Sequence, residues 1–176
     1  MYNNTIQKHK VFISYYHHDD QYYKNYIDQY LSRNIVNKSV MFGEYDSENS
    51  DEYVKRLIRE DKISDSSVIV VLVGPNTKKR KHVDWEIYAG LRKSINGISG
   101  LVAIFLPTLP KATNGGYYYA DMPARLADNI ISKYADWYEW DYAIEHFDAI
   151  IEEAFNNRKT RKNLIDNSRI QMQKNL

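Results

Sequence analysis

Val68-Ile69-Val70-Val71-Leu72-Val73, followed at once by Gly74-Pro75, is apolar at all six positions. An apolar run of this length, closed by turn residues, is typical of a strand that is buried on both faces. Strands of parallel sheets carry such runs because helices cover both faces of the sheet. The segment therefore predicts a strand of a buried parallel sheet.

Three further segments, on either side of this one, also have the character of strands. Before it come Lys10-Val11-Phe12-Ile13-Ser14 and Val40-Met41-Phe42, and Gly43 ends the second of these. After it, residues 101–106 are apolar throughout and end at Pro107. Short runs of β-branched, aliphatic and aromatic residues next to polar or turn residues favour strands.

Apolar residues recur at helical spacing in the intervals between these strands. We expect helices over residues 19–33, from near Ser50, and over residues 83–95. A short helix is predicted after Pro123. A final helix carries one apolar stripe, made of Ile144, Phe147, Ile151, Ala154 and Phe155.

Strand and helix thus alternate four times, which predicts an α/β domain with a central parallel sheet flanked by helices on both faces, in three layers. The crossovers between its strands should be right-handed. Such sheets bind ligands beyond the carboxyl ends of their strands. We therefore expect a site among residues 14–20, 43–49 and 74–86 and the loop after Leu106.

The composition excludes several classes of protein and site. The 176 residues contain no cysteine, which rules out a disulfide scaffold, a thiolate zinc site, an iron–sulfur cluster and a cysteine nucleophile. The longest apolar runs fall far short of the roughly 20 residues that cross a bilayer. The N-terminus lacks the apolar core of a secretory signal. We therefore expect a cytoplasmic protein without a membrane contact.

Charge is distributed unevenly along the chain. Residues 158–176 contain six basic residues and one acid, for a net charge of +5, whereas residues 1–157 contain 18 basic and 22 acidic residues, for a net charge of −4. We expect a single domain over residues 1–157 and a basic polar tail over residues 158–176 that is frayed or partly helical. Binding of nucleic acid through the tail and the 16 tyrosines is ranked last, because nucleic-acid readers more often have a basic folded domain.

Two polar clusters that follow predicted strands are candidate sites. His17-His18-Asp19-Asp20 has the residue types of a metal site, but neither helical spacing nor a distant histidine completes one. We therefore expect a solvated loop and no bound metal there. Lys78-Lys79-Arg80-Lys81-His82 is either a solvated loop or a source of positive charge for a pyrophosphate.

Glu86 is the sharpest candidate for a catalytic residue. On the helix predicted over residues 83–95 it lies in the first turn, at the edge of the apolar stripe. Ala89 and Gly90, one turn further on, leave room beside its carboxylate. The alternative is a structural acid that complements the helix dipole, an interaction worth about 0.3–1 kcal/mol.

Two motifs resemble those of the Toll/interleukin-1 receptor-like (TIR-like) family, in particular the bacterial TIR-like proteins of the Thoeris anti-phage system. Val11-Phe12-Ile13-Ser14-Tyr15 is similar to the family's first strand, and His82-Val83-Asp84-Trp85-Glu86-Ile87 is similar to the segment with its catalytic glutamate. Residues 122–129 and 137–140 also resemble this branch, and the order of the elements agrees over about residues 8–155. The resemblance implies a flavodoxin-like (TIR-like) fold.

The chain departs from the family pattern at one position. The family usually has a tryptophan four residues before the glutamate, where this chain has His82, and Trp85 stands immediately before Glu86. Either the wall of the ligand site is remodelled, or the activity of this member differs.

The resemblance implies that Glu86 is the catalytic acid of an NAD+-consuming enzyme, with NAD+ as the substrate and no separate cofactor. It also implies that residues 15–20 border the nucleotide and that residues 42–46 contact a neighbouring subunit in active assemblies. The residues implied to bind substrate are Ser14, Tyr15, Tyr16, Phe42, Asp46, His82 and Trp85, the last two beside the nicotinamide ribose.

One carboxylate is chemically sufficient for this reaction. Hydrolysis of an ordinary glycoside needs a second carboxyl group, because the leaving oxygen must be protonated. The nicotinamide of NAD+ leaves from a cationic nitrogen and departs neutral, so one carboxylate can bind the ribose hydroxyls and stabilise the developing positive charge. Attack by water then gives ADP-ribose, an internal hydroxyl gives a cyclic isomer, and an added nucleophile gives a conjugate.

The resemblance further implies a function in anti-phage defence. Such an enzyme would self-associate on activation, with a phage protein as a candidate trigger, and its ADP-ribose-derived signal would activate a separate effector protein. The departure at His82 leaves an alternative open, a non-catalytic TIR-like scaffold that acts through homotypic association.

Overall fold

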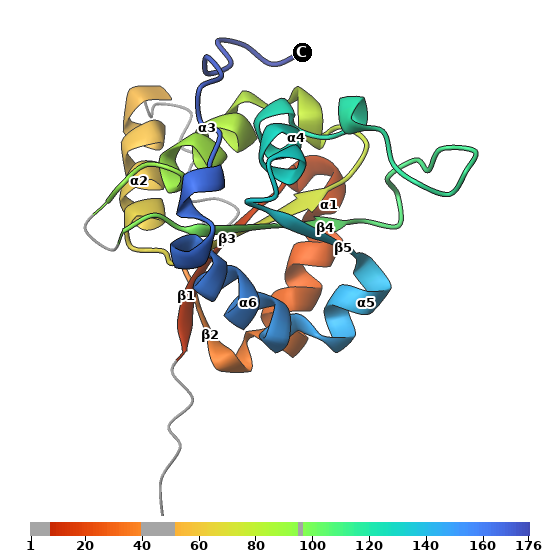
Figure 1. Cartoon of the computed structure of the whole chain (residues 1–176), viewed down its shortest axis with the longest axis horizontal. Helices are drawn as coiled ribbons and strands as arrows, with labels where there is room; N and C mark the ends of the chain where they lie inside the picture. Colours follow the sequence, from red (N-terminus) through yellow and green to blue (C-terminus); the bar gives the residue numbers. More distant parts are fainter. Residues whose placement is uncertain (1–7, 40–51, 95–96) are drawn as a thin grey trace, which may run out of the picture.

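The computed structural model describes residues 8–39, 52–94 and 97–176 of the chain. Within these ranges one parallel sheet has the strand order β2-β1-β3-β4-β5 (Figure 1). The chain moves outward from β1 to β2 and then crosses to the other side of β1, so the strand order reverses at the β1/β3 boundary. The predicted α/β fold is confirmed. The strands are β1 (His9–Ser14), β2 (Ile35–Asn37), β3 (Val68–Val73), β4 (Gly100–Phe105) and β5 (Asp136–Glu139).

Helices follow the strands in the expected alternation. The first predicted helix is α1, continued by a π-helical turn at Ile27–Leu31 and a 3-10 turn at Ser32–Asn34. The helices are α1 (His17–Tyr26), α2 (Glu52–Ser64), α3 (Lys81–Gly90), α4 (Ala124–Ile131), α5 (Trp140–Glu145) and α6 (Phe147–Thr160).

The side chains of β3 alternate between two hydrophobic clusters, one on each face of the sheet. Ile69, Val71 and Val73 pack with side chains of α2, α3 and α4, and the alternate three residues pack with α1, α5 and α6. Every residue of β3 is at most 1% exposed. Burial of a large aliphatic side chain is worth about 1.5–3 kcal/mol, which explains why this run is apolar at each position and confirms the three layers.

Two strands differ from the prediction. The strand predicted at residues 40–42 lies outside the described residues, and the strand that pairs with the outer side of β1 is β2. The predicted strands did not include β5, which lies at the other edge of the sheet and alternates half-buried and exposed residues. Its Trp137 stacks on Phe105 of β4 with ring centroids 5.0 Å apart, so packing rather than an apolar run stabilises it.

Helix α3 and the predicted final helix also have other bounds than the prediction gave them. Residues 83–95 were expected to be helical, but α3 ends at Gly90, whose backbone oxygen accepts a hydrogen bond from the Ser99 nitrogen at 2.9 Å. A Cβ atom at Gly90 would lie 1.9 Å from Cδ1 of Ile69, so glycine lets the helix pass close to β3. The predicted final helix is divided at His146 into α5 and α6, because His146 leaves the helical conformation.

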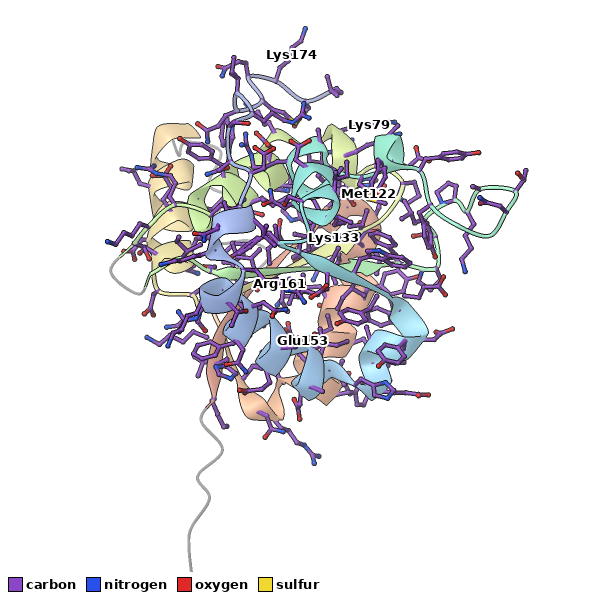
Figure 2. The ribbon with its side chains drawn as sticks, viewed as in Figure 1. Lys79, Met122, Lys133, Glu153, Arg161 and Lys174 are labelled. Atoms are coloured by element: carbon purple, nitrogen blue, oxygen red, sulfur yellow. The ribbon has the colours of Figure 1, made fainter. Side chains whose placement is uncertain are left out.

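The C-terminal residues, expected to be frayed or partly helical, are held against the domain by hydrogen bonds. Helix α6 continues to Thr160, and the residues after it pack against α4 and α3. The guanidinium of Arg161 donates to Asp136 at 2.8 Å and to the backbone oxygen of Lys133 at 3.2 Å (Figure 2). Further along, Oδ1 of the fully buried Asn129 accepts from the backbone nitrogen of Asp166 at 3.0 Å. Polar side chains buried on α4 need such partners.

None of the helices in the described ranges combines the length and the apolar character that spanning a membrane would demand.

Candidate active site

Glu86 lies on α3 and is buried, with 5% of its surface exposed. Its Oε2 atom accepts a hydrogen bond from the Ser14 hydroxyl at 2.5 Å. Ser14 is the last residue of β1 and is itself 1% exposed. The carboxylate therefore lies at the carboxyl end of an inner strand, beside the β1/β3 boundary, where α/β sheets of this kind bind their ligands.

Arg59, on α2, is the second partner of this carboxylate. Its Nε atom lies 3.2 Å from Oε1 of Glu86, and the two side chains are 14% and 6% exposed. The contact is an ion pair rather than a well-directed hydrogen bond. A buried carboxylate needs such a partner, because an unpaired charge in the protein interior is costly.

Burial raises the pKa of the Glu86 carboxyl, and the charge of Arg59 and the hydrogen bond from Ser14 oppose that rise. The nearby His17 opposes it to a smaller extent. A carboxylate must be ionised to stabilise positive charge on a sugar. Arg59 and Ser14 therefore favour the form of Glu86 that this chemistry would use.

His82 lies one turn before Glu86, and its ring is nearly parallel to that of His17, with centroids 5.6 Å apart. Its Nε2 atom lies 3.3 Å from the backbone oxygen of Tyr15. Because a carbonyl oxygen only accepts, this contact assigns the proton of the neutral ring to Nε2 and leaves Nδ1 as an acceptor. Burial, and then the charge of Arg59, lower the pKa of His82 to about 4, so the ring is neutral at pH 7.

The two tyrosines after Ser14 have different surroundings. Tyr15 is buried, and its hydroxyl donates to Oε1 of Gln21 at 2.9 Å. The ring of Tyr16 is partly exposed, and the guanidinium carbon of Arg80 lies 4.0 Å from its centroid. The Nε atom of Arg80 is buried without a hydrogen-bond acceptor in the described part of the chain. Arg80 thus has a positive charge and an unsatisfied donor at the start of α3.

The basic run at residues 78–82 divides between two sides of α3. Lys78 pairs with Asp121 at 2.6 Å, on the side of α4. Arg80 and His82 instead contact the two tyrosines after β1. Only this second part of the run can contribute to a site around Glu86.

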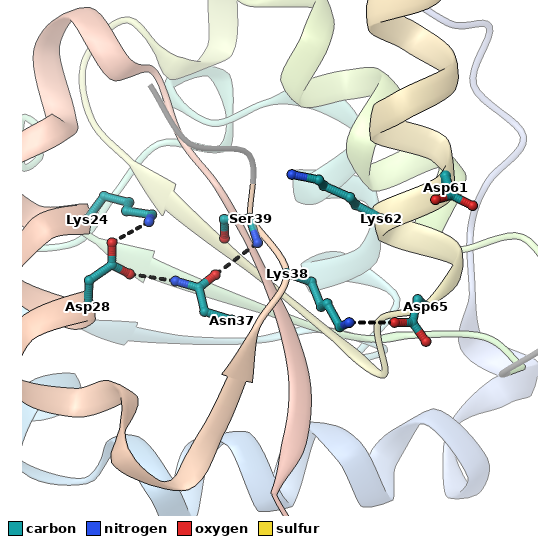
Figure 3. A pocket seen from close by; sticks show the side chains of 8 residues that line it. All are labelled: Lys24, Asp28, Asn37, Lys38, Ser39, Asp61, Lys62 and Asp65. Carbon is teal, nitrogen blue, oxygen red and sulfur yellow. Dashed lines mark hydrogen bonds and ion pairs between the residues drawn. The ribbon is translucent and has the colours of Figure 1, made fainter. Parts of the chain in front are cut away.

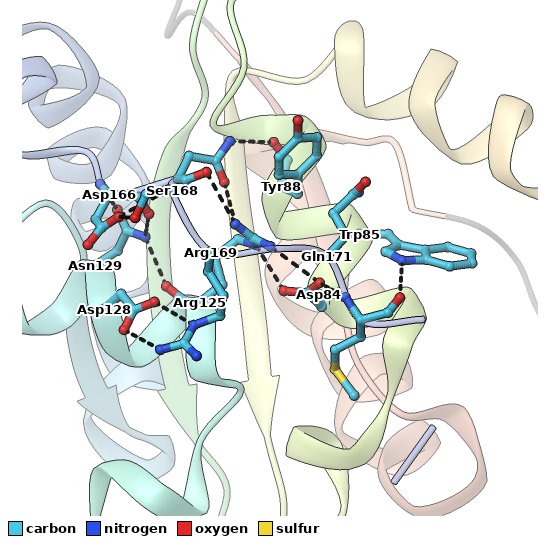
Figure 4. A network of polar contacts seen from close by, with 12 residues as sticks. Asp84, Trp85, Tyr88, Arg125, Asp128, Asn129, Asp166, Ser168, Arg169 and Gln171 are labelled. Carbon is cyan, nitrogen blue, oxygen red and sulfur yellow. Dashed lines mark hydrogen bonds and ion pairs between the residues drawn. The ribbon is translucent and has the colours of Figure 1, made fainter. Parts of the chain in front are cut away.

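Trp85 lies against the C-terminal segment, which runs along the outer side of α3 (Figure 4). The indole Nε1 atom donates to the backbone oxygen of Met172 at 2.8 Å. The backbone N–H of Met172 donates to Oδ2 of Asp84 at 2.8 Å. Asp84 also forms a buried ion pair with Arg125 at 2.9 Å. The structure therefore brings Ser14, Tyr15 and His82 together around Glu86 but places the Trp85 indole against the C-terminal segment.

Two predicted site residues, Phe42 and Asp46, lie outside the described residues. The polar cluster at residues 17–20 does not converge. His18 and Asp19 pair with each other at 2.8 Å, while Asp20 is buried near the Thr77 hydroxyl at 3.3 Å. Across the described ranges, no three histidine, aspartate or glutamate side chains gather as a metal site would require.

Three residues of this arrangement were not singled out by name, although His17 lies in the segment 15–20 that was expected to border the nucleotide and Arg80 lies in the basic run 78–82. His17 and Arg80 belong to polar clusters that follow predicted strands, so their positions in the sequence were a signal. Arg59 had no such signal beyond its place on the helix predicted from near Ser50, because only the packing of α2 on α3 brings it to Glu86.

A separate cavity of about 420 Å³ lies between α1, β2 and the end of α2, and its wall is charged (Figure 3). Lys24 pairs with Asp28, and Lys38 pairs with Asp65 at 2.6 Å. Three lysines and three aspartates line the cavity in all, so its side-chain charges balance. A wall whose side-chain charges balance, and of which two pairs are already formed, has little reason to bind an ion.

A match to one protein family covers more than half of the chain. A family model described as the Thoeris protein ThsB, TIR-like domain, matches residues 12–111. Among solved structures, the chain is similar to the TIR domains in the structure of the activated Roq1 resistosome directly recognizing the pathogen effector XopQ. The identity is 15%, 84% of each chain is covered, and the TM-score is 0.43. No curated protein matches the chain.

Proposed function

Because the chain belongs to the family of the Thoeris protein ThsB, TIR-like domain, we propose that it cleaves nicotinamide from NAD+ and makes a cyclic or conjugated ADP-ribose signal. The observation that carries this proposal is the buried Glu86 carboxylate, held at the carboxyl end of β1 by Ser14 and Arg59. Such a solitary acid suits the loss of a neutral nicotinamide and suits ordinary glycoside hydrolysis poorly.

The proposed reaction breaks the bond between ribose C1′ and the pyridinium nitrogen, and the electron pair leaves on that nitrogen. The C1′ atom becomes positively charged, and the ionised Glu86 stabilises that charge through the ribose hydroxyls. An oxygen nucleophile then bonds to C1′ and releases its proton to the solvent. Water as the nucleophile gives ADP-ribose, and a hydroxyl of the same molecule gives the cyclic product, which a site that excludes water favours.

The neighbours of Glu86 suggest how NAD+ would lie. The neutral ring of His82, one turn before Glu86, has an acceptor at Nδ1 for a ribose hydroxyl. Arg80 has a positive charge and a buried, unsatisfied Nε donor next to the Tyr16 ring, which suits a pyrophosphate. NAD+ would therefore extend from Glu86 along the start of α3.

Both oxygens of Glu86 face protein groups, so ribose hydroxyls would have to replace one of them. We place the exchange at Arg59, on α2. The protein would then be inactive at rest and would gain activity when self-association, with a phage protein as the trigger, displaces Arg59. The product would act on a separate effector protein in anti-phage defence.

The test is the release of nicotinamide from NAD+ by purified protein, with and without lysate from phage-infected cells. We expect release to depend on the lysate and to be lost in Glu86→Gln, which keeps the size of the side chain but not its charge. Glu145→Gln makes the same chemical change at an exposed position on α5 and should leave release unchanged. Equal release from Glu86→Gln and the wild type would overturn the assignment.

A non-catalytic scaffold is the second candidate, and His82 in place of the usual tryptophan favours it. The two candidate functions predict different effects of Glu86→Gln on the protection of infected cells. A scaffold would still protect cells that carry Glu86→Gln, whereas the proposed enzyme would not, and mass spectrometry of the small molecules in those cells would show whether a product is missing.

A further inference from the structure

A cavity of about 640 Å³ lies between the C-terminal segment, the start of α4 and the short 3-10 turn at Thr77–Lys79. Lys79, Met122 and Lys174 belong to its wall, at the end of the molecule where the C-terminal segment lies (Figure 2). Asp84 also lines it, on the part of α3 that faces the C-terminal segment. The cavity is therefore separate from the carboxylate of Glu86, which faces β1 and α2.

Part of the wall of this cavity is apolar, and we call this part the floor and the charged part the rim. Met122, Pro123 and Ala124 contribute from the start of α4, and Ile170 and Leu176 contribute from the C-terminal segment. Ile170 and Leu176 are 85% and 77% exposed, although hydrogen bonds hold the segment around them in place. The volume falls within the roughly 300–1,000 Å³ of small-molecule sites. Two large exposed apolar side chains on a docked segment leave apolar surface for a ligand to cover.

The rim of the cavity is cationic, unlike the charge-balanced cavity of Figure 3. Its charged side chains are Lys78, Lys79, Arg169 and Lys174 against the single acid Asp84. Asp84 is already neutralised by Arg125, and Lys78 and Arg169 pair with carboxylates outside the cavity wall.

Two lysines of the rim are paired with no carboxylate side chain in the described part of the chain. The ammonium group of Lys79 donates to the neutral amide oxygen of Asn76 at 2.9 Å. In the described part of the chain, neither Lys79 nor Lys174 forms an ion pair. Positive charge beside an apolar floor is complementary to one kind of small molecule, an apolar body with one anionic group.

We propose that this cavity binds a small amphipathic anion, with its aromatic or aliphatic body on the floor and its carboxylate, sulfonate or phosphate at Lys79 and Lys174. The site is independent of NAD+ cleavage and does not rest on the proposed function. Its occupant would bridge the C-terminal segment and the start of α3, because Met172 in the wall of the cavity donates to Asp84.

The test uses two fluorescent probes with the same aromatic skeleton and the full-length protein. Anilinonaphthalene sulfonate carries the anion, and N-phenylnaphthylamine lacks it. We expect the sulfonate to bind with a stoichiometry of one and to resist displacement by excess NAD+. The paired substitution Lys79→Glu with Lys174→Glu should weaken its binding by at least about tenfold and leave the neutral probe unaffected.

Two further variants separate this site from other sources of fluorescence. Lys93→Glu changes the same charge at an exposed position after the far end of α3 and should leave both probes unchanged. Ala124→Trp, at an exposed residue of the floor, should fill the cavity and abolish binding of both probes while the far-ultraviolet circular dichroism and the urea-denaturation midpoint stay native.

Three results would overturn the proposal. They are sulfonate binding that NAD+ displaces, equal affinities in the paired lysine variant and in Lys93→Glu, and unchanged binding in a folded Ala124→Trp.

Discussion

Replacing Asp84 by asparagine removes the counter-charge of Arg125, a guanidinium that is 0% exposed beneath the C-terminal segment (Figure 4). Nε of Arg125 donates to Oδ1 of Asp84 at 2.9 Å, and Nη2 lies 3.4 Å from Oδ2. Oδ2 also accepts from the backbone N–H of Met172. One carboxylate thus joins α3, α4 and the C-terminal segment, and its loss should weaken all three contacts.

The expected cost follows from burial. Removing one partner of a buried ion pair leaves the other charge uncompensated, which typically costs 3–5 kcal/mol, or about a third of the stability of a domain. Asparagine retains one acceptor oxygen for the three donors, so we expect Asp84→Asn to lower the free energy of unfolding by about 3 kcal/mol. In a domain of this size the melting temperature should fall by roughly 6–12 °C.

Urea denaturation measures this cost, and the chain offers a matched control. Asp128 also pairs with an arginine, Arg169, through two short contacts on the same side of the molecule, but that arginine is 47% exposed. Exposed pairs are worth about 0–1 kcal/mol, so Asp128→Asn should change the free energy of unfolding little. Combining Asp84→Asn with Arg125→Met removes both buried charges and should recover part of the loss.

The reasoning would be refuted if Asp84→Asn cost no more than Asp128→Asn. That result would mean that water or a shift of the C-terminal segment compensates Arg125, and the network would then be peripheral to stability. An equal loss in Asp84→Asn and in its combination with Arg125→Met would show that the lost contact to Met172, not the buried charge, sets the cost.

Two other substitutions test the packing around the sheet. Burial raises the pKa of Asp20 from 3.8 to about 6, so the folded state binds this proton more tightly than the unfolded state and stability falls as pH rises from about 4 to 6. Asp20→Asn should remove this fall and raise the free energy of unfolding at pH 7 by about 1–3 kcal/mol. Asp19→Asn should lower the free energy of unfolding at pH 7, because hydrogen bonds lower the pKa of Asp19. Urea denaturation at pH 4 and pH 7 measures both variants, and a destabilised Asp20→Asn at pH 7 would contradict the assignment. Gly100→Ala would place a Cβ atom 2.1 Å from the backbone oxygen of Ala154 on α6, so it should cost at least about 2 kcal/mol. Gly116→Ala meets only a side-chain oxygen, at 3.3 Å, and should be nearly neutral in the same thermal melt; equal melting temperatures would show that α6 can shift.

The sequence predicted the strands that are buried on both faces and missed the edge strand β5, which is only half-buried. Strand β3 and nearly all of β4 follow from unbroken apolar runs, because both faces of these strands lie in hydrophobic clusters. Strand β5 has no such run, since an edge strand with two acids is half-buried at most, and stacking of Trp137 on Phe105 is a tertiary contact.

The packing of the C-terminal segment also could not be predicted from its polar sequence. A run of basic and amide residues cannot be told from a frayed tail unless the groups that it hydrogen-bonds are known. Those groups include Arg125 and Asn129, both 0% exposed, on the inner side of a short helix. Their burial follows from the orientation of α4, which no local pattern specifies.

The candidate site was predictable only where its residues adjoin strands. Ser14 ends the first predicted strand, and Glu86 stands in a recognisable motif, and the structure joins them by a hydrogen bond. Arg59 comes from a helix whose approach to α3 is fixed by packing over the sheet, so its contact with Glu86 could not be read from spacing.

The two partners of Glu86 differ in how firmly they are anchored, and this difference decides which of them a substrate can replace. Ser14 is the last residue of β1, where it is paired with Val71 of β3, so its backbone is held at the centre of the sheet. Arg59 lies on α2, which packs on the outside of the sheet and whose described side chains contribute only Ile63 to the buried cluster. The long side chain of Arg59 can leave Glu86 by rotating about its own bonds. The short Ser14 side chain stays close to Glu86 as long as β1 keeps its pairing with β3. A ribose that reaches Glu86 would therefore keep the Ser14 contact and take the place of Arg59.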